Sequence, residues 1–78
     1  MDFSQKLVAL REERRQNQTA SAIGIGTTQR KVSYWETGAT EPCLEDLKRI
    51  CQYYQVSADY LIGLTDDPQP YPLPQRKQ

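Results

Sequence analysis

The stretch TTQRKVSYWETG, residues 27–38, decides the fold because its spacing is that of a short helix with two different faces. Its two large apolar side chains, Val32 and Trp35, stand three residues apart, so a helix would place both on the same face. Two anchors are few for a helix of this length. The sequence therefore predicts a shallowly anchored helix over about residues 28–37.

The opposite face of this predicted helix is polar. Its side chains follow a helical spacing and would form one stripe of hydrogen-bonding groups: Gln29, Arg30, Ser33, Tyr34 and Thr37. Thr28 can cap the first turn, and Gly38 stands where a left-handed residue often ends a helix. On composition alone, a solvated face of a helical bundle explains such a stripe more simply than a binding surface does. The rest of the chain has to decide between the two.

Length and composition limit the classes of function. A chain of 78 residues is expected to form one small domain without a deep catalytic cleft. The absence of histidine removes histidine-based catalysis, and two cysteines are too few for a structural zinc site of the usual kind. We therefore expect no enzyme activity, no metal site and no cofactor. No apolar run is long enough to span a bilayer and the first residues lack the order of a signal peptide, so we expect a cytoplasmic protein without membrane contact.

The net formal charge is zero, but the charged side chains are unevenly distributed. Residues 1–38 carry six basic and four acidic side chains, whereas residues 39–78 carry four basic and six acidic ones. The half of the chain that contains the polar helix is thus the basic half. This difference is modest and by itself says little about an anionic partner.

Apolar spacing and capping residues predict four further helices, over about residues 3–15, 18–25, 44–54 and 58–62. Either Asp2 or Ser4 can cap the first of them. The side chains expected on their inner faces are Phe3, Leu7, Leu10, Ala22, Ile25, Leu44, Leu47, Ile50, Cys51, Tyr54, Tyr60, Leu61 and Leu64. The predicted fold class is therefore all-α, with five short helices and no internal repeat.

The two cysteines are predicted to be structural and free. If both belong to the helix near residues 44–54, Cys43 and Cys51 lie roughly 12 Å apart, too far for a disulfide. Cys51 falls on the apolar face and is expected to be a small core residue. Cys43 stands at the start of the helix, where a thiol is a poor cap.

The last part of the chain has a different composition. Residues 66–78 contain Pro68, Pro70, Pro72 and Pro74, which favour an extended or disordered segment over packed structure. We expect the domain to cover residues 1–65 and this proline-rich segment to be a flexible tail. A binding motif for a partner protein is the alternative explanation of its composition.

The helices near 18–25 and 28–37 are separated by a short turn that contains Gly26, which is typical of a helix-turn-helix. In that motif the first helix braces against the DNA backbone, and the second lies in the major groove with its outer side chains near the base edges. Gln29 and Arg30 suit this use because amide and guanidinium groups form paired hydrogen bonds with adenine and guanine.

The segment GTTQRKVSYWETG, residues 26–38, resembles the recognition segment of the lambda-repressor-like family of helix-turn-helix regulators, also called the Cro/C1-type or XRE family. The resemblance extends over about residues 3–65 without gaps. It includes LREE at 10–13, VSADYLIG at 56–63, and Gln18, Ala22, Pro42, Leu44 and Leu47 at the spacing of the family. It implies a compact five-helix DNA-binding domain.

The resemblance also implies a role for each residue of the interface. Side chains expected to face base edges are Gln29, Arg30, Ser33 and Tyr34. Side chains expected near phosphates are Asn17, Gln18, Thr28, Lys31 and Thr37. Phosphate contacts position such a domain, whereas base contacts select the sequence. Tyr34 could meet a thymine methyl group, a sugar or only a neighbouring side chain, and Lys31 could equally be a solvated charge.

Two further features of the family concern helix orientation. The resemblance implies a partly buried ion pair between Arg11 and Glu36. Gln16 and Ser21 depart from the family, which usually has apolar residues at these positions and forms a hydrophobic staple there. Together with Gly24, which costs about 1 kcal/mol relative to alanine in a helix, this substitution predicts a weakly held second helix.

We therefore expect a sequence-specific transcriptional regulator of double-stranded DNA that acts as a repressor and binds a near-palindromic operator as a homodimer. The dimer contact is expected on the fourth and fifth helices, with Tyr53, Tyr54 or Tyr60 at their surface. The alternative is a protein-interaction module on the same fold, such as an antitoxin or antirepressor. Its partner would bind through the tail or through Ile23, which stands where the family usually has a charged residue and could instead reflect a variant packing.

Overall fold

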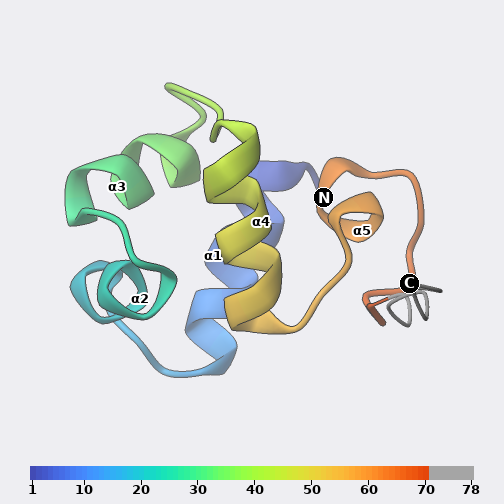
Figure 1. Ribbon diagram of the computed structural model, residues 1–78, viewed down its shortest axis with the longest axis horizontal. Coiled ribbons are helices and arrows are strands. Elements are labelled where there is room, and N and C mark those ends of the chain that lie inside the picture. Colours follow the sequence, from blue (N-terminus) through green and yellow to red (C-terminus); the bar gives the residue numbers. More distant parts are fainter. Residues whose placement is uncertain (71–78) are drawn as a thin grey trace, which may run out of the picture.

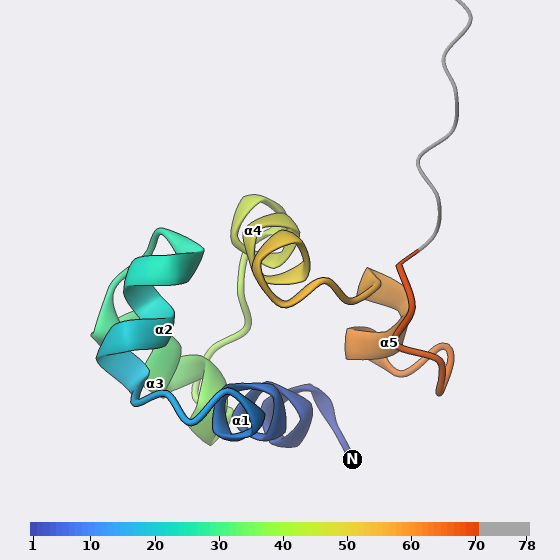
Figure 2. The same cartoon turned by 90° about the horizontal axis from the view of Figure 1, so that it is seen from below.

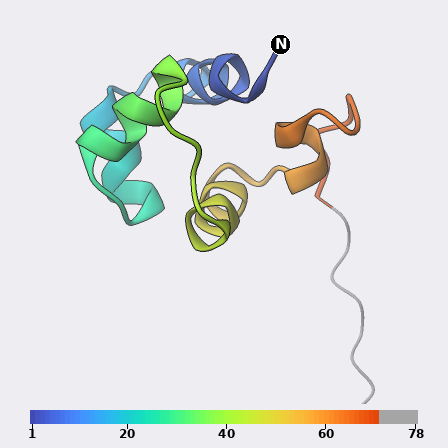
Figure 3. The same cartoon turned by 90° about the horizontal axis from the view of Figure 1, so that it is seen from above.

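The computed structural model describes residues 1–70 and, within them, contains five α-helices and no strand. The helices are α1 (Phe3–Glu13), α2 (Gln18–Ile25), α3 (Gln29–Thr37), α4 (Leu44–Tyr54) and α5 (Ala58–Ile62). Figure 1 shows α2 and α3 side by side at one end of the molecule and α5 at the other, with α1 and α4 between them. Views from below and above show the same order (Figure 2, Figure 3). The predicted all-α class is confirmed.

Side chains at the helix starts explain where the helices begin. Capping side chains accept a hydrogen bond from the first turn at four of the five starts: Asp2, Asn17, Thr28 and Ser57. Asp2, rather than Ser4, caps α1 and forms a reciprocal capping box with Gln5. Cys43 precedes α4 without capping it, which agrees with the expectation for a thiol.

The first helix is shorter than predicted. It ends at Glu13 instead of continuing to residue 15, because Arg15 takes a left-handed conformation with φ of 55°. Left-handed residues do not continue a right-handed helix. The chain therefore turns there toward the start of α2.

One hydrophobic core joins all five helices. Its buried side chains are Leu7, Ala22, Ile25, Val32, Trp35, Ile50, Tyr54, Val56 and Leu61. The prediction was wrong for Leu44 and Leu64, which are 84% and 74% exposed. Leu44 is the first residue of α4 and lies before the helix reaches the core, while Leu64 follows the left-handed Gly63, where the chain changes direction.

Gly24 is required where α2 meets α4. A Cβ atom at this position would overlap the outer atoms of the Tyr53 ring, so any other residue would fit only if that ring moved. Tyr53 itself is held in place, because the guanidinium of Arg14 lies 4.8 Å from its ring centre and the Gln16 amide donates to its hydroxyl. The glycine that weakens the isolated helix therefore serves its packing.

We expect Gly24→Ala to lower the free energy of unfolding by about 1–3 kcal/mol through overpacking. Alanine favours a helix over glycine by about 1 kcal/mol, so the opposite sign would follow if helix propensity dominated. Urea unfolding followed by circular dichroism distinguishes the two. The same substitution in a Tyr53→Ala background should no longer destabilise, and a stabilised Gly24→Ala single variant would contradict the packing explanation.

Polar groups occupy the positions of the missing staple at the start of α2. Gln16 is bonded to Tyr53, and its backbone carbonyl accepts from Arg11 Nη1 at 2.8 Å. Ser21 is 1% exposed, and its hydroxyl donates to the Gln18 carbonyl at 3.0 Å. The hydrogen bonds of Gln16 thus link the start of α2 to α1 and α4, whereas the hydroxyl of Ser21 bonds within α2. That α2 is weakly held stays a prediction.

One backbone hydrogen bond connects the start of the proline-rich segment to α5, while the expected domain boundary at residue 65 stays a prediction. The backbone N–H of Ser57 donates to the Pro68 carbonyl at 3.0 Å, which attaches the first part of the proline-rich segment to the start of α5. The rest of the expected tail, residues 71–78, lies outside the described residues. Among residues 1–70 there is no helix with the length and apolar character needed to cross a membrane.

Both cysteines are free, and Cys51 is half-buried beside the core. Burial raises the pKa of its thiol, so the reactive thiolate form is disfavoured. The prediction of a structural rather than reactive Cys51 agrees with this environment.

Candidate nucleic-acid interface

The turn between α2 and α3 brings these two helices together at an angle. Gly26 takes a left-handed conformation with φ of 94°, and its N–H closes α2 by donating to the Ala22 carbonyl. Thr28 then caps α3 by accepting from the N–H of Lys31 at 3.2 Å. Only residues 26–28 separate the helices, as in a helix-turn-helix.

The two faces of α3 are as predicted. Val32 and Trp35 are 1% and 2% exposed and anchor the helix in the core. Gln29, Arg30 and Tyr34 are exposed on the outer side. Ser33 is half-buried between the two faces, and the exposed Thr37 hydroxyl donates to the Tyr34 carbonyl at 3.3 Å. The polar stripe is therefore a surface of the protein.

Two of the residues expected near phosphates also act as helix caps. The Asn17 carboxamide oxygen accepts from the N–H of Ala20 at 2.8 Å, and the Thr28 oxygen accepts from α3. The amide donors of Asn17 and the hydroxyl hydrogen of Thr28 are not used by these caps. Both residues thus keep donors of the kind that bind phosphate oxygens.

Arg11 and Glu36 form the ion pair that the resemblance implies. Arg11 Nε donates to Glu36 Oε2 at 2.7 Å, and Arg11 Nη2 donates to Glu36 Oε1 at 3.0 Å. The two side chains are 17% and 4% exposed, so this is a bidentate, mostly buried pair between α1 and α3. The hydrogen bond and negative charge of Glu36 raise the pKa of Arg11.

A chain of hydrogen bonds connects this ion pair to the polar stripe. Gln18 Nε2 donates to Glu36 Oε1 at 3.1 Å, and Gln29 Nε2 donates to Gln18 Oε1 at 2.6 Å. A carboxylate only accepts, so it fixes which end of the Gln18 amide faces Glu36. Gln29 is then left with its oxygen and one N–H for an external partner.

Lys31 has an ionic partner that sequence reasoning missed. Its Nζ lies 3.7 Å from Asp46 Oδ2, and Arg49 Nη1 lies 3.7 Å from Asp46 Oδ1. Asp46 is a nearly buried carboxylate of α4, with a side chain that is 9% exposed. Lys31 therefore balances this charge and links α3 to α4, although its own side chain remains 58% exposed. Nothing in the local sequence pattern identifies such a contact across 15 residues.

Arg30 differs from Lys31 in this respect. It is exposed and forms no ion pair within the part of the chain that the structure describes. Arg49, in contrast, pairs with Glu45 and Asp46, and its Nη1 lies 3.5 Å from the Gly26 carbonyl at the turn between α2 and α3. Arg30 is thus the free cation at the outer face of α3.

Of the three tyrosines named for a dimer surface, Tyr54 is buried, so the prediction is wrong for that residue. Tyr53 and Tyr60 are half-buried, and the location of a dimer contact stays a prediction. Tyr54 is 5% exposed, and burial raises the pKa of its phenol. Tyr53 is covered by Arg14 and Gln16, and Lys6 Nζ lies 4.6 Å from the centre of the Tyr60 ring. Aromatic rings here pack against cations instead of standing free.

Other apolar side chains are exposed instead. Ile23, on the outer surface of α2, is 76% exposed, which excludes a variant packing of α2 as the reason for an isoleucine here. Leu44, Ile62 and Leu64 are exposed around α4 and α5. The sequence pattern suggested exposure for Ile23 but not for Leu44 or Leu64, because those two leucines also fit an inner helical face.

Residues 2–61 match the family model of the helix-turn-helix domain. The HTH-type transcriptional regulator YobD of Bacillus subtilis (strain 168) is 34% identical over 68 residues, which cover 87% of this chain and 61% of YobD. The chain thus spans about three fifths of the length of this curated relative.

Two solved structures of the P22 c2 repressor are similar to the fold. The crystal structure of that repressor in complex with synthetic operator 9T has a TM-score of 0.77 at 28% sequence identity, covering 81% of this chain and 96% of that chain. The solution NMR structure of its DNA-binding domain has a TM-score of 0.72 at 30% identity, covering 78% of this chain and 80% of that chain.

Proposed function

Because the chain belongs to the helix-turn-helix family of lambda-repressor-like transcriptional regulators, we propose that it binds a near-palindromic operator in double-stranded DNA as a homodimer and acts as a repressor. It would act in the cytoplasm without a cofactor. Repression would follow from occupancy, because a protein that covers promoter DNA excludes the polymerase.

The observation that carries this proposal is the ordered polar stripe of α3. Val32 and Trp35 hold the helix from inside, and the hydrogen bonds from Glu36 through Gln18 hold Gln29 from outside. On a helix face that contacts only water, nothing would require the Gln29 amide to be held in one orientation. The remaining N–H and oxygen of Gln29 match the paired acceptor and donor of an adenine edge in the major groove.

In this proposal the residues divide by function. Base edges are read by Gln29, Arg30, Ser33 and Tyr34. Phosphates are bound by Asn17, Gln18, Thr28, Lys31 and Thr37. Arg11 and Glu36 position the interface without touching DNA. Lys31 contributes less than its charge suggests, because Asp46 already neutralises part of it.

The homodimer is proposed because one short helix in one groove reads only a few base pairs. Two copies on half-sites about one helical turn apart double the number of bases read. The P22 c2 repressor, whose structure was solved in complex with a synthetic operator, has a similar fold, and this similarity supports operator binding by the present chain.

Selection of bound duplexes from a random DNA pool at moderate salt tests the function directly. A two-fold-symmetric motif with half-sites about 10 base pairs apart is the expected result. Retention without an enriched motif would contradict sequence-specific recognition and indicate binding through phosphates alone. A complete lack of retention would contradict the regulator function and favour a protein partner, for which the exposed Ile23 is the first surface to test.

Arg30→Ala is expected to weaken binding to the selected sequence by about 1–3 kcal/mol per half-site and to relax the preference at one base pair. The physical reason is the loss of two hydrogen bonds from a guanidinium that has no ion pair among residues 1–70. Titration of labelled duplexes that carry each base at that position measures both effects.

Arg30→Lys is the matched control, because it keeps the charge and removes the planar pair of donors. If Arg30 reads a base, lysine should restore affinity for DNA in general but not the preference. Full recovery of the preference by lysine would show that Arg30 acts only as a charge.

A further inference from the structure

Asp46, near the start of α4, contacts two cations at once. Its Oδ2 lies 3.7 Å from Lys31 Nζ, and its Oδ1 lies 3.7 Å from Arg49 Nη1. The Asp46 side chain is 9% exposed, whereas those of Lys31 and Arg49 are 58% and 45% exposed. A nearly buried carboxylate with one negative charge thus has two cationic neighbours, and both neighbours reach the solvent.

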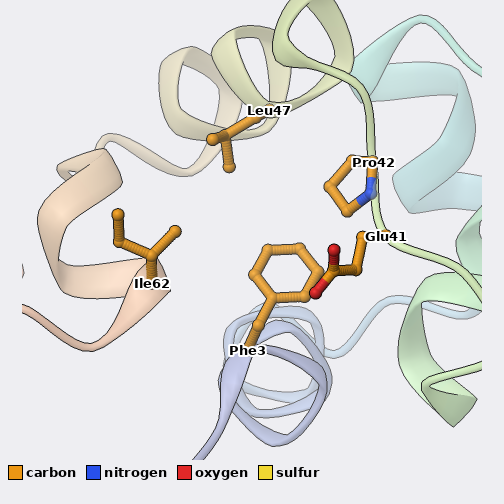
Figure 4. Close-up of a pocket in the computed structure, with 5 residues that line it drawn as sticks. All are labelled: Phe3, Glu41, Pro42, Leu47 and Ile62. Atoms are coloured by element: carbon orange, nitrogen blue, oxygen red, sulfur yellow. The ribbon is translucent and has the colours of Figure 1, made fainter.

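The Asp46 cluster, which we define as Lys31, Asp46 and Arg49, lies where α4 meets the helix-turn-helix. Lys31 belongs to α3, and Arg49 Nη1 is near the carbonyl of Gly26 in the turn before that helix. The neighbouring Leu47 belongs instead to an apolar hollow between α1, α4 and α5, which Figure 4 shows. A change at Asp46 therefore alters the side of α4 that faces the helix-turn-helix and leaves this hollow in place.

The contact with Asp46 holds Lys31 without fixing it. A separation of 3.7 Å is a charge contact rather than a hydrogen bond, for which donor and acceptor lie about 2.7–3.2 Å apart. Lysine also carries its charge on a flexible stem. Because more than half of the Lys31 side chain is exposed, its ammonium can turn from Asp46 to an anion outside the protein.

A phosphate of the DNA backbone is the anion that suits this position. When a helix lies in the major groove, its outer side chains face base edges, and the side chains on its flanks face the sugar-phosphate strands. Lys31 lies on the flank of α3 that faces α4, since its partner Asp46 is a residue of α4. Asp46 and a phosphate therefore compete for the same ammonium.

Arg49 keeps Asp46 compensated when Lys31 leaves. A buried carboxylate that loses its counter-charge is strongly destabilising. Arg49, three residues further along α4, remains beside Asp46 whichever anion Lys31 binds. Asp46 also belongs to the first turn of α4, where the helix dipole favours a negative charge. Transfer of Lys31 to DNA thus leaves no stranded charge inside the protein.

We propose that Asp46 is an internal counter-anion of the DNA interface, which holds Lys31 in the free protein and yields it to a backbone phosphate on binding. The proposal rests on the DNA binding proposed above and names a residue that sets its strength. Asp46 weakens binding to every duplex by a similar factor, because phosphates carry no sequence information. The choice of bases stays with the polar stripe of α3.

Asp46→Asn tests the proposal, because it removes the charge and keeps the shape of the side chain. Binding should become about twofold to fivefold tighter per copy, the range for a partly exposed ion pair, on the selected sequence and on an unrelated duplex alike. Titration of both labelled duplexes measures the change. If Asp46 only fastened α3 to α4, its loss would weaken binding, so unchanged or weaker binding would overturn the proposal.

Two controls separate this contact from a general effect of charge. Glu45→Gln changes the net charge equally at the preceding residue, but Glu45 pairs with Arg49, at 3.6 Å, rather than with Lys31. The gain from Asp46→Asn should disappear in a Lys31→Met background, whereas any gain from Glu45→Gln should persist there. A gain from Asp46→Asn that survives without Lys31 would overturn the proposal.

A measurement on the unaltered protein does not depend on how the variants fold. NMR of the lysine ammonium groups should show a scalar coupling between the Lys31 nitrogen and a DNA phosphorus in the complex. Lys31→Met assigns the resonance. An ammonium resonance of Lys31 that stays the same in free and bound protein would show that Asp46 keeps it, which would overturn the proposal.

Failure of DNA binding is distinguishable from failure of this inference. If the unaltered protein binds both duplexes and Asp46→Asn gives no gain, only the inference fails. If it binds neither duplex, the proposed function fails, and elution from phosphocellulose by salt still measures the competition for a phosphate. Asp46→Asn should then elute at higher salt than Glu45→Gln, which has the same net charge. Equal elution of the two variants would overturn the inference as well.

Discussion

Replacing Glu36 by alanine should lower the free energy of unfolding by about 3–5 kcal/mol, because it leaves the Arg11 guanidinium mostly buried without its counter-charge. The pair is bidentate, and the Glu36 side chain is only 4% exposed. Small domains have a total stability of about 5–15 kcal/mol, so this loss is a large share of it. Urea unfolding followed by circular dichroism measures the change.

Glu45→Ala provides the control for this result. Glu45 also pairs with an arginine, at 3.6 Å from Arg49, but both side chains of that pair are about half exposed. Exposed pairs contribute about 0–1 kcal/mol, so the control should be close to the unaltered protein. Equal losses in the two variants would show that burial of the Arg11–Glu36 pair does not determine its contribution.

Trp35→Ala should also cost about 3–5 kcal/mol, the range for removing a large aromatic side chain from a core. Trp35 is 2% exposed and is one of only two buried anchors of α3. Its backbone carbonyl also accepts from Ser4 Oγ at 2.7 Å, which ties the same turn of α3 to α1. Since the helix that carries the polar stripe depends on this anchor, operator affinity should fall with stability.

The neighbouring Tyr34 supplies the matched control for Trp35. It is an aromatic residue of the same helix but is 43% exposed on the outer face. Tyr34→Ala should change stability by no more than about 0.5 kcal/mol, while it can still alter DNA affinity. A stability loss in Tyr34→Ala comparable with that in Trp35→Ala would contradict the assignment of the two faces of α3.

The helices were predictable from sequence because their determinants are local. Caps such as Asn17 and Thr28 satisfy backbone N–H groups within their own first turn, and Gly26 and Gly38 end helices through their own conformation. The spacing of Val32 and Trp35 likewise follows from one helix alone. These features need no knowledge of where other helices lie.

Contacts between helices were not predictable in the same way. The requirement for Gly24 depends on Tyr53 of another helix, and the partner of Lys31 is Asp46 of α4. Sequence spacing says nothing about such distances. The ion pair of Arg11 with Glu36 was expected only because the chain resembles a family, not because of any pattern between the two residues.

The errors concern residues whose exposure is set at the ends of helices. Leu44 and Leu64 fit apolar helical spacing, but one precedes and the other follows the turns that face the core. Tyr54 was predicted both for the apolar face of a helix and for a dimer surface. It is buried in the core, so only the prediction of an apolar face is confirmed. Helical spacing predicts the direction in which a side chain points around the helix axis. It does not predict whether that part of the helix lies against the core.

Trp35 is the only tryptophan of the chain, and it lies buried directly beneath the polar stripe. When light beyond the absorption of the five tyrosines is used for excitation, the fluorescence of this protein therefore comes from one residue, located in the helix proposed to enter the groove. Its emission reports whether α3 is seated on the core, while circular dichroism reports the helices as a whole. If α3 detaches from the core before the other helices unfold, the emission of Trp35 will change before the circular dichroism signal does. This difference can be measured without an attached dye.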